Sequence, residues 1–459
     1  MRWGTTSVLI VVATPDPNTR ETVPRPQSIG IRRRLNALLP PERIERHATE
    51  SGLIRRRRKL EAQAMLWTLV LGFGTGRSRS LAALRRTYQR VTGTSLAASS
   101  FQERFSPALV RFVRTVLAEL FERTAHERPA MRGLLEPFAD VVLADASVIA
   151  LHRRLASLFP GTRTNSSPAA AKLHLVHSLM GSGVGRASIS AERTGDRQKL
   201  RIGPWVEKRL LIFDLGYFGY RLFDRIGRNG GFFLSRLAPR ADPRIVAEHR
   251  RWRGRTAPLI GHRLSAVAGR LRREELDVEV EVEFKRLYGG RRRKVRRRLR
   301  LLGVREIESG RYRFYLTNIE PAMLDAQAIA QVYAARWQAE LVFKQMKGHY
   351  RLEQIPSRKP AAVEALILAS VMTWLVSGHL LEALRRQLGE KSRRLREDRW
   401  AALFASAATS VLDVLTLPSR VAGPIARRLE SMLLHEAIDP NVRRMSLIER
   451  VDMEGVWSR

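Results

Sequence analysis

Cysteine is absent from this chain of 459 residues, and acidic side chains are scarce relative to basic ones. The absence of cysteine excludes a disulfide framework, thiolate metal sites and a cysteine nucleophile, and it is typical of a reducing compartment such as the cytoplasm. The chain has 82 Lys and Arg residues against 44 Asp and Glu residues, which gives a net charge of +38. A polyanion, above all nucleic acid, is therefore the expected partner.

Lysine is also rare, because only ten of the 82 basic residues are lysine and the other 72 are arginine. Arginine presents a planar fork that suits phosphate oxygens and base edges. A codon bias toward Arg and Ala in a GC-rich genome explains this choice equally well. Such a bias does not explain the net charge.

The sequence lacks a convincing secretion or membrane signal. The apolar run at residues 7–13 is too short to cross a bilayer, and it has neither a basic region before it nor a cleavage site after it. The run at 363–384 is long enough, but it contains Glu364, Thr373 and His379. These polar residues favour a buried core helix over a membrane span, so no membrane partner is expected.

The length predicts two to four structural units, whose boundaries follow changes in pattern. Residues 1–28 contain four prolines without sustained periodicity and are expected to form a disordered tail. Helical patterns and basic clusters predict an all-α N-terminal domain at 29–135. It resembles helix-turn-helix DNA-binding units, with packing or dimerisation as the alternative. A helical C-terminal region is expected at 391–459, with 401–434 as a candidate for dimerisation.

Strand patterns predominate from residue 136. The apolar runs 140–145 and 210–214 each end in an acid, Asp145 and Asp214. Two buried strands that each carry a carboxylate at the carboxyl end form the arrangement in which open α/β sheets present their chemistry. We therefore expect an α/β domain in two parts, 136–240 and 319–390, separated by a β-rich insertion at 241–318. Asp196 and Asp224 are expected to be ordinary surface or capping acids.

The insertion contains a strand pattern whose pairing can be predicted. Residues 276–285 alternate between apolar and charged side chains, Gly289–Gly290 supplies a two-residue turn, and a second strand follows at 291–300. This turn places Glu283 opposite Arg296, Glu281 opposite Arg298, Glu279 opposite Arg300, Val280 opposite Leu299, and Val278 opposite Leu301. Cross-strand pairs then account for about half of the basic charge of the strand at 291–300. Arg291 to Arg293 and Arg297 remain as candidates for DNA contact.

The strongest chemical signal lies at 333–347, in a segment rich in helix formers. The spacing places Tyr333, Arg336, Glu340 and Lys347 on one helix face, within an arc of about 60°. A carboxylate flanked by cations and a phenol suits metal-assisted phosphodiester chemistry, because the acid holds a hard cation and its neighbours hold phosphates. A solvated face with scattered charges is the alternative, which Asp145 and Asp214 weaken.

This combination resembles the DDE transposases of bacterial insertion sequences, specifically the insertion element four family. The family signature is Tyr, two residues, Arg, three residues, Glu, six residues and Lys, and the segment at 333–347 fits it at every position. Asp145 matches the first family acid, at the end of the first strand of an RNase H-like fold, and Asp214 matches the second. The resemblance covers residues 30–385 approximately. It implies an α/β, RNase H-like catalytic domain interrupted by the β-rich insertion.

The resemblance also implies a function, namely cut-and-paste transposition of the chain's own insertion sequence. Asp145, Asp214 and Glu340 would be the catalytic residues and would hold two Mg²⁺ ions, which Mn²⁺ could replace. Tyr333, Arg336 and Lys347 would grip DNA phosphates. Trp337 would stack on a displaced base or pack within the fold, and Arg236 would contact DNA or cap a strand.

The partners implied by the resemblance are double-stranded DNA, as terminal inverted repeats and target DNA, and a second copy of the chain in a homodimer on paired ends. The expected location is the bacterial cytoplasm, at the nucleoid. Two alternatives remain open. One is an RNase H-like nuclease without strand transfer, and the other is a catalytically dead derivative that only binds DNA.

Overall fold

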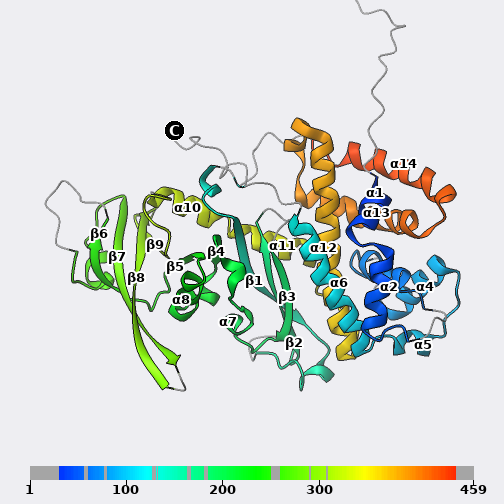
Figure 1. Cartoon of the computed structure of the whole chain (residues 1–459), viewed down its shortest axis with the longest axis horizontal. Helices are drawn as coiled ribbons and strands as arrows, with labels where there is room; N and C mark the ends of the chain where they lie inside the picture. The colour runs from blue at the N-terminus through cyan, green and yellow to red at the C-terminus, as the bar shows by residue number, and fades with distance from the viewer. Residues whose placement is uncertain are drawn as a thin grey trace, which may run out of the picture.

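The computed structural model describes residues 30–55, 60–76, 80–126, 131, 133–162, 167–179, 184–249, 259–288, 291–306 and 309–440. The expected disordered tail at 1–28 and the Gly289–Gly290 turn lie outside these ranges. A set of helices forms one side of the molecule and a long sheet forms the other (Figure 1).

Helices from both ends of the chain build a helical body with one hydrophobic core. From the N-terminal part come α1 (Ile31–Leu38), α2 (Pro41–Glu50), α3 (Ala62–Trp67), η1 (Thr68–Phe73), α4 (Leu81–Thr92), α5 (Ala98–Glu103) and α6 (Pro107–His126). The C-terminal part supplies α12 (Pro360–Leu388), η6 (Gly389–Arg394), α13 (Glu397–Thr416) and α14 (Ser419–Glu436). The apolar residues of α13, including Trp400, Phe404 and Leu415, are buried in this shared core. Packing within one chain therefore accounts for much of the apolar pattern at 401–434.

The apolar run at 363–384 forms the centre of α12, which runs beside α6 on the side of the helical body next to the sheet (Figure 1). The helix is long and apolar enough to span a membrane, but 78% of its most apolar window is buried inside the chain. Thr373 donates a hydrogen bond of 2.6 Å to the Val70 carbonyl of η1. A Cβ atom at Gly74 would lie 1.8 Å from the Thr373 hydroxyl, so glycine permits this close approach. The prediction of a buried core helix is confirmed.

The sheet has nine strands in the order β3-β2-β1-β4-β5-β9-β8-β7-β6. The strands are β1 (Asp140–Ala150), β2 (Ala170–Ser178), β3 (Gly185–Ala191), β4 (Arg209–Phe213), β5 (Phe232–Arg236), β6 (Arg244–Glu248), β7 (Glu275–Tyr288), β8 (Arg291–Arg305) and β9 (Tyr312–Thr317). β1, β4 and β5 pair in parallel, and every other neighbouring pair is antiparallel. The strands of the expected insertion therefore extend the same sheet.

Helices cover both faces of the central strands, which explains why these strands are almost continuously apolar. α8 (Tyr220–Arg228) packs on the face that carries Val142 and Leu211. α10 (Ala326–Ala334) packs on the opposite face, which carries Val141 and Ile212. α11 (Trp337–Gly348) follows α10 and leads toward the helical body. Short helical segments complete the connections: η2 (Gly133–Leu135), η3 (Arg153–Leu155), α7 (Asp196–Lys199), η4 (Pro204–Val206), η5 (Leu215–Tyr217) and α9 (Leu264–Ala268).

The β7–β8 pairing confirms the predicted register. Glu283 lies opposite Arg296, Glu281 opposite Arg298, Glu279 opposite Arg300, Val280 opposite Leu299, and Val278 opposite Leu301. The local alternation of charged and aliphatic residues was sufficient for this prediction, because a shift by one residue would expose every aliphatic side chain.

The expectation for Asp224 is wrong, because this acid is a buried anchor. Its side chain on α8 is only 3% exposed. It accepts hydrogen bonds from Arg297 of β8 at 2.8 Å and from Arg228 at 3.1 Å, and Arg286 of β7 lies 3.9 Å away. α8 packs against β7, so the carboxylate comes within reach of both strands of the hairpin. Arg297, expected as a DNA contact, is therefore engaged in this ion pair.

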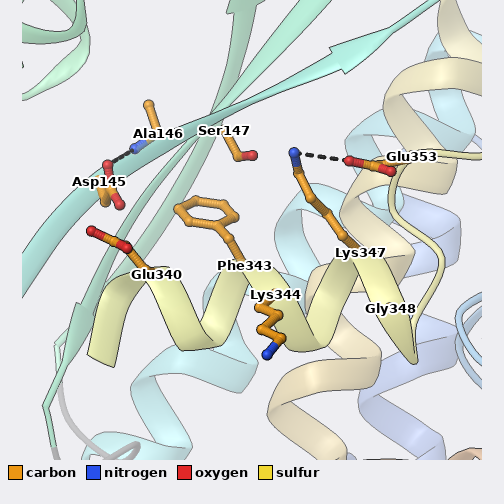
Figure 2. A pocket seen from close by; sticks show the side chains of 9 residues that line it. All are labelled: Asp145, Ala146, Ser147, Glu340, Phe343, Lys344, Lys347, Gly348 and Glu353. Atoms are coloured by element: carbon orange, nitrogen blue, oxygen red, sulfur yellow. Dashed lines mark hydrogen bonds and ion pairs between the residues drawn. The ribbon is translucent and has the colours of Figure 1, made fainter. Parts of the chain in front are cut away.

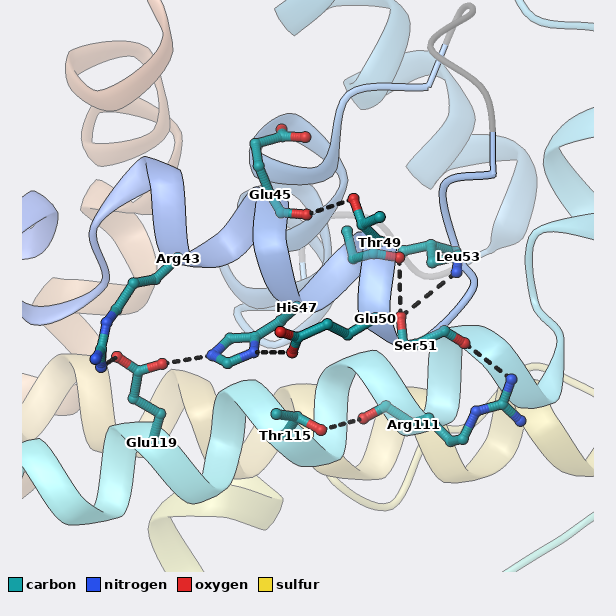
Figure 3. Close-up of polar contacts among 11 residues, drawn as sticks. Arg43, Glu45, His47, Thr49, Glu50, Ser51, Leu53, Arg111, Thr115 and Glu119 are labelled. Atoms are coloured by element: carbon teal, nitrogen blue, oxygen red, sulfur yellow. Dashed lines mark hydrogen bonds and ion pairs between the residues drawn. The ribbon is translucent and has the colours of Figure 1, made fainter.

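A second buried carboxylate joins α2 to α6 within the helical body (Figure 3). Glu119 of α6 accepts hydrogen bonds from Arg43 and His47 of α2 at 2.5 and 2.6 Å, and from Arg123 at 2.7 Å. Burial alone would raise the pKa of Glu119, but these three donors lower it to about 2. The ionised carboxylate therefore stabilises the folded state.

Replacement of Glu119 by Gln is expected to lower the free energy of unfolding by about 2 kcal/mol at pH 7, because one amide oxygen cannot serve three donors. The folded-state pKa lies below the ordinary value of 4.5, so this stabilisation is complete above pH 4.5 and is lost as the pH falls toward 2. Urea unfolding of wild type and Glu119→Gln at pH 7 and pH 3 measures the effect. Glu103→Gln, at an exposed acid of α5, is the matched control. A difference of equal size at both pH values would contradict the explanation.

Candidate active site

β1 and β4 bring two acids to one edge of the sheet. Asp214 directly follows β4, as the sequence predicted. Asp145 lies next to the last residue of β1 that pairs with β4, because Ala144 is the partner of Phe213. The prediction that the strand ends at Asp145 is wrong. β1 continues to Ala150 because β2 pairs with it over the whole distance, although β4 has already ended.

The signature segment is not one straight helix. α10 ends at Ala334 and α11 begins at Trp337, and the amides of Ala335, Arg336, Gln338 and Ala339 all donate to carbonyls three residues earlier. Such bonds wind the chain more tightly than an α-helix, at three residues per turn. The predicted single face over 333–347 is therefore wrong in detail, and Tyr333 belongs to a different helix from Glu340 and Lys347.

Tyr333 faces the protein interior. It is 7% exposed, its ring packs 5.1 Å from the Tyr315 ring, and its hydroxyl donates to the Phe213 carbonyl at 3.3 Å. Burial raises its pKa to about 12, so the hydroxyl keeps its proton. Tyr333 thus contacts the last residue of β4, immediately before Asp214.

An open hollow of about 560 Å³ lies between β1 and α11 (Figure 2). It is lined by Asp145, Ala146 and Ser147 of β1, by Glu340, Phe343, Lys344, Lys347 and Gly348 of α11, and by Glu353. The carboxylates of Asp145 and Glu340 point toward one another at one end of the hollow, and the Lys347 ammonium lies at the other. Two carboxylates therefore face each other at one end of the hollow, and a lysine lies at the other end.

Ion pairs hold the charged side chains of α11 in place. Arg336 donates to one Glu340 oxygen at 2.6 Å, and Lys347 pairs with Glu353 at 2.9 Å. The pKa of Asp145 is raised to about 6, chiefly by burial and further by the negative charges of Asp214 and Glu340. The Ala146 amide donates to Asp145 at 2.7 Å, and Arg336 also opposes the rise. The three acids thus share one electrostatic environment.

Trp337 and Arg236 are both exposed near this edge. Trp337 is 53% exposed, which excludes the alternative that it packs within the core. Arg236 is the last residue of β5, the strand next to β4, and its charge acts on both Tyr333 and Tyr315. Both side chains are therefore accessible to a large ligand that covers the carboxyl ends of β4 and β5.

The donor chemistry of the three acids suits a hard divalent cation, because carboxylate oxygens are the ligands that Mg²⁺ prefers. The raised pKa of Asp145 reflects the cost of ionising this buried acid, and a bound cation would lower that cost. In the described part of the chain, no three His, Asp or Glu side chains are already grouped as a complete ligand set. One Glu340 oxygen is instead occupied by Arg336.

Comparison with known proteins identifies the family. Residues 136–376 match the family described as "Transposase DDE domain". The chain belongs to the DDE transposases. This chain is 20% identical over 402 residues to the transposase for insertion sequence element IS231B of Bacillus thuringiensis subsp. berliner, across 78% of this chain and 80% of the relative. It is also 20% identical over 384 residues to the transposase for element IS1151 of Clostridium perfringens, across 76% and 81%.

These matches show that the transposase is an insertion-sequence enzyme that acts on DNA, and such enzymes generally use divalent metal ions. The sequence analysis did not single out several residues of the hollow, among them Ser147 and Glu353. Ser147 lies on the same side of β1 as Asp145, two positions on, so strand periodicity could have found it. Glu353 follows α11, and no local pattern links it to Lys347.

Replacement of Asp145 by Asn is expected to stabilise the transposase by about 2 kcal/mol at pH 7.5 without divalent cations, because it removes a buried negative charge. The folded-state pKa of about 6 lies above the ordinary 3.8, so the wild type loses stability as the pH rises from about 4 to 6. Urea unfolding at pH 7.5 and pH 4 measures this difference, which is expected to vanish at the lower pH. Asp214→Asn, at an exposed acid, is the control with a smaller expected effect. Equal stabilisation at both pH values would disprove the electrostatic cause.

Proposed function

We propose that the transposase moves its own insertion sequence by cut-and-paste, with metal-dependent cleavage at the terminal inverted repeats followed by strand transfer. The observation that supports this most is the opposition of Asp145 and Glu340 across one hollow, at the sheet edge where Asp214 follows β4. Arg336 and Lys347 add positive charge to the same helix region, as a phosphodiester substrate requires.

We further propose that the catalytic domain has an RNase H-like core made of β1 to β5. The order β3-β2-β1-β4-β5, in which only β2 runs against the other four, supports this. The N-terminal helices are proposed as a DNA-binding domain, built into the helical body together with α12 to α14. Strands β6 to β9 would then be an insertion that lengthens the sheet.

Asp145, Asp214 and Glu340 are proposed to hold two Mg²⁺ ions, with Mn²⁺ as a substitute. When bound, these ions would supply activation of the attacking oxygen and stabilisation of the leaving oxygen. Glu340 would have to exchange its Arg336 partner for this role, which frees the guanidinium to bind a phosphate. Arg336 is therefore proposed to stabilise Glu340 before DNA arrives and to contact DNA afterwards.

The other side chains divide between positioning and DNA binding. The hydrogen bond from Tyr333 to the Phe213 carbonyl would fix the residue before Asp214. Lys347 and Arg236 would bind phosphates at the two sides of the site, and exposed Trp337 would stack on a displaced base. Double-stranded DNA and a second copy of the chain, in a homodimer on paired ends at the nucleoid of the cytoplasm, complete the proposed assembly.

Cleavage and strand transfer on a duplex that carries the element's own ends test the proposal. Wild type with Mg²⁺ is expected to cut and join, and Glu340→Ala is expected to lower both rates by about a thousandfold or more. Glu353→Ala is the matched control, because it removes another carboxylate from the same hollow and should leave most of the activity.

Two other results would each favour a different function. Cutting without joining by the wild type would indicate an RNase H-like nuclease. Binding without cutting by both wild type and Glu340→Ala would indicate a derivative that only binds DNA.

A further inference from the structure

The β7–β8 hairpin extends beyond the strands that flank it. β7 and β8 pair continuously from Glu275 opposite Val304 to Tyr288 opposite Arg291. β9 covers β8 only from Arg300 onward, and β6 covers β7 only as far as Glu281. Residues 282–288 and 291–299 therefore form a two-stranded ribbon that projects from the sheet (Figure 1). We call this ribbon the hairpin arm.

The hairpin arm is almost purely cationic. Between Glu283 and Glu306 the sequence contains no acid. Nine basic residues lie in this part of the arm: Lys285, Arg286, Arg291, Arg292, Arg293, Lys294, Arg296, Arg297 and Arg298. Repulsion among these like charges destabilises the ribbon when it is alone in water. The charge therefore indicates an anionic partner.

Ion pairs near the base of the arm neutralise only part of this charge. Glu283 pairs with Lys294 at 3.1 Å and with Arg296 at 3.3 Å. Glu279 lies 3.5 Å from Arg298. Because these cations are each about two-thirds exposed or more, the pairs are solvent-screened and leave donors available.

Three other cations of the arm differ from those that are paired with Glu283 and Glu279. The side chains of Lys285, Arg291 and Arg292 are exposed, and within the described residues none of the three has an acidic partner. Arg291 and Arg292 are consecutive in β8, so they point to opposite faces of the ribbon. The end of the arm therefore presents cations on both faces.

Buried Asp224 holds the arm in a defined direction. Its hydrogen bond with Arg297 at 2.8 Å connects the arm to α8, and Arg286 approaches the same carboxylate from β7. A free two-stranded ribbon is only marginally stable in water. The anchor therefore fixes the base and leaves the distal cations open to solvent.

The arm points away from the carboxylate edge. β8 runs parallel to β4 and β5, because β9 is antiparallel to both β5 and β8. The tip of the arm lies where β8 begins, whereas Asp214 lies where β4 ends. Because the two strands are parallel, the tip and Asp214 lie at opposite strand ends of the sheet. At about 3.4 Å per residue, the nine steps from Arg300 to Arg291 span about 30 Å.

We propose that the hairpin arm is a further DNA-binding surface, which holds the sugar-phosphate backbone of duplex DNA at a distance from the scissile phosphate. Arg291, Arg292 and Lys285 form its contacts. The proposal rests on the proposed function only in taking duplex DNA as the partner. The same chemistry fits the element's own end and the target DNA, and the experiment separates these two sources.

The double substitution Arg291→Ala/Arg292→Ala tests the surface in the full chain. Arg427→Ala/Arg428→Ala is the matched control, since it removes the same charge from an exposed pair on α14, at the other end of the molecule (Figure 1). Dissociation constants are measured over a range of salt concentrations on a duplex with the element's end and on an unrelated duplex.

The arm variant is expected to bind DNA about tenfold more weakly, with a salt slope shallower by about 2, whereas the control behaves as wild type. A loss confined to the end duplex identifies the element's end as the ligand, and a loss on both duplexes identifies sequence-independent DNA such as the target. An arm variant that binds both duplexes as the control does, while the wild type cuts and joins, overturns the proposal. A wild type that neither cuts nor joins would instead count against the proposed function.

The absence of cysteine allows a direct measurement of position. Arg292→Cys creates a unique site for a photo-crosslinker in the full chain. Crosslinks to duplex DNA are expected at backbone positions separated from the cleaved bond. Crosslinks only beside the cleaved bond, or none while DNA stays bound, would overturn the assignment.

Discussion

The burial of Asp145 beside two other acids is the constraint on which the carboxylate edge of the sheet depends. Burial raises the cost of ionising Asp145, and the negative charges of Asp214 and Glu340 raise it further. Arg336 offsets part of it through its ion pair with Glu340. The tight turn between α10 and α11 brings this arginine into the site, and the Tyr333 hydrogen bond ties α10 to the end of β4. The local architecture thus stabilises a concentration of negative charge that an isolated sheet edge would not tolerate.

The sequence predicted those features that depend on neighbours along the chain. The register of β7 and β8 follows from an alternating pattern on either side of one turn, and the structure has the same pairs. The position of Asp214 after β4 follows from the end of an apolar run. In both cases the deciding interactions lie within a few residues of the pattern itself.

Features that depend on distant partners could not be predicted in this way. The continuation of β1 past Asp145 requires β2, and the burial of Asp224 requires Arg297, which is 73 residues away in sequence. The break between α10 and α11 occurs among strong helix formers, so helix propensity does not predict it. Net charge likewise does not show which cations bind DNA, because some of them stabilise the fold. Arg300, for example, is 5% exposed and binds Asp277 at 2.6 Å.

The helical body combines segments from both ends of the chain, and this affects the order in which the protein can fold. α1 to α6 leave the ribosome long before α12 to α14 exist to cover their apolar faces. Contacts between such distant segments also slow folding. A gene copy interrupted before the codons for α12 would therefore yield N-terminal helices with an incomplete core. Such a truncated product would expose apolar surface and be open to proteolysis.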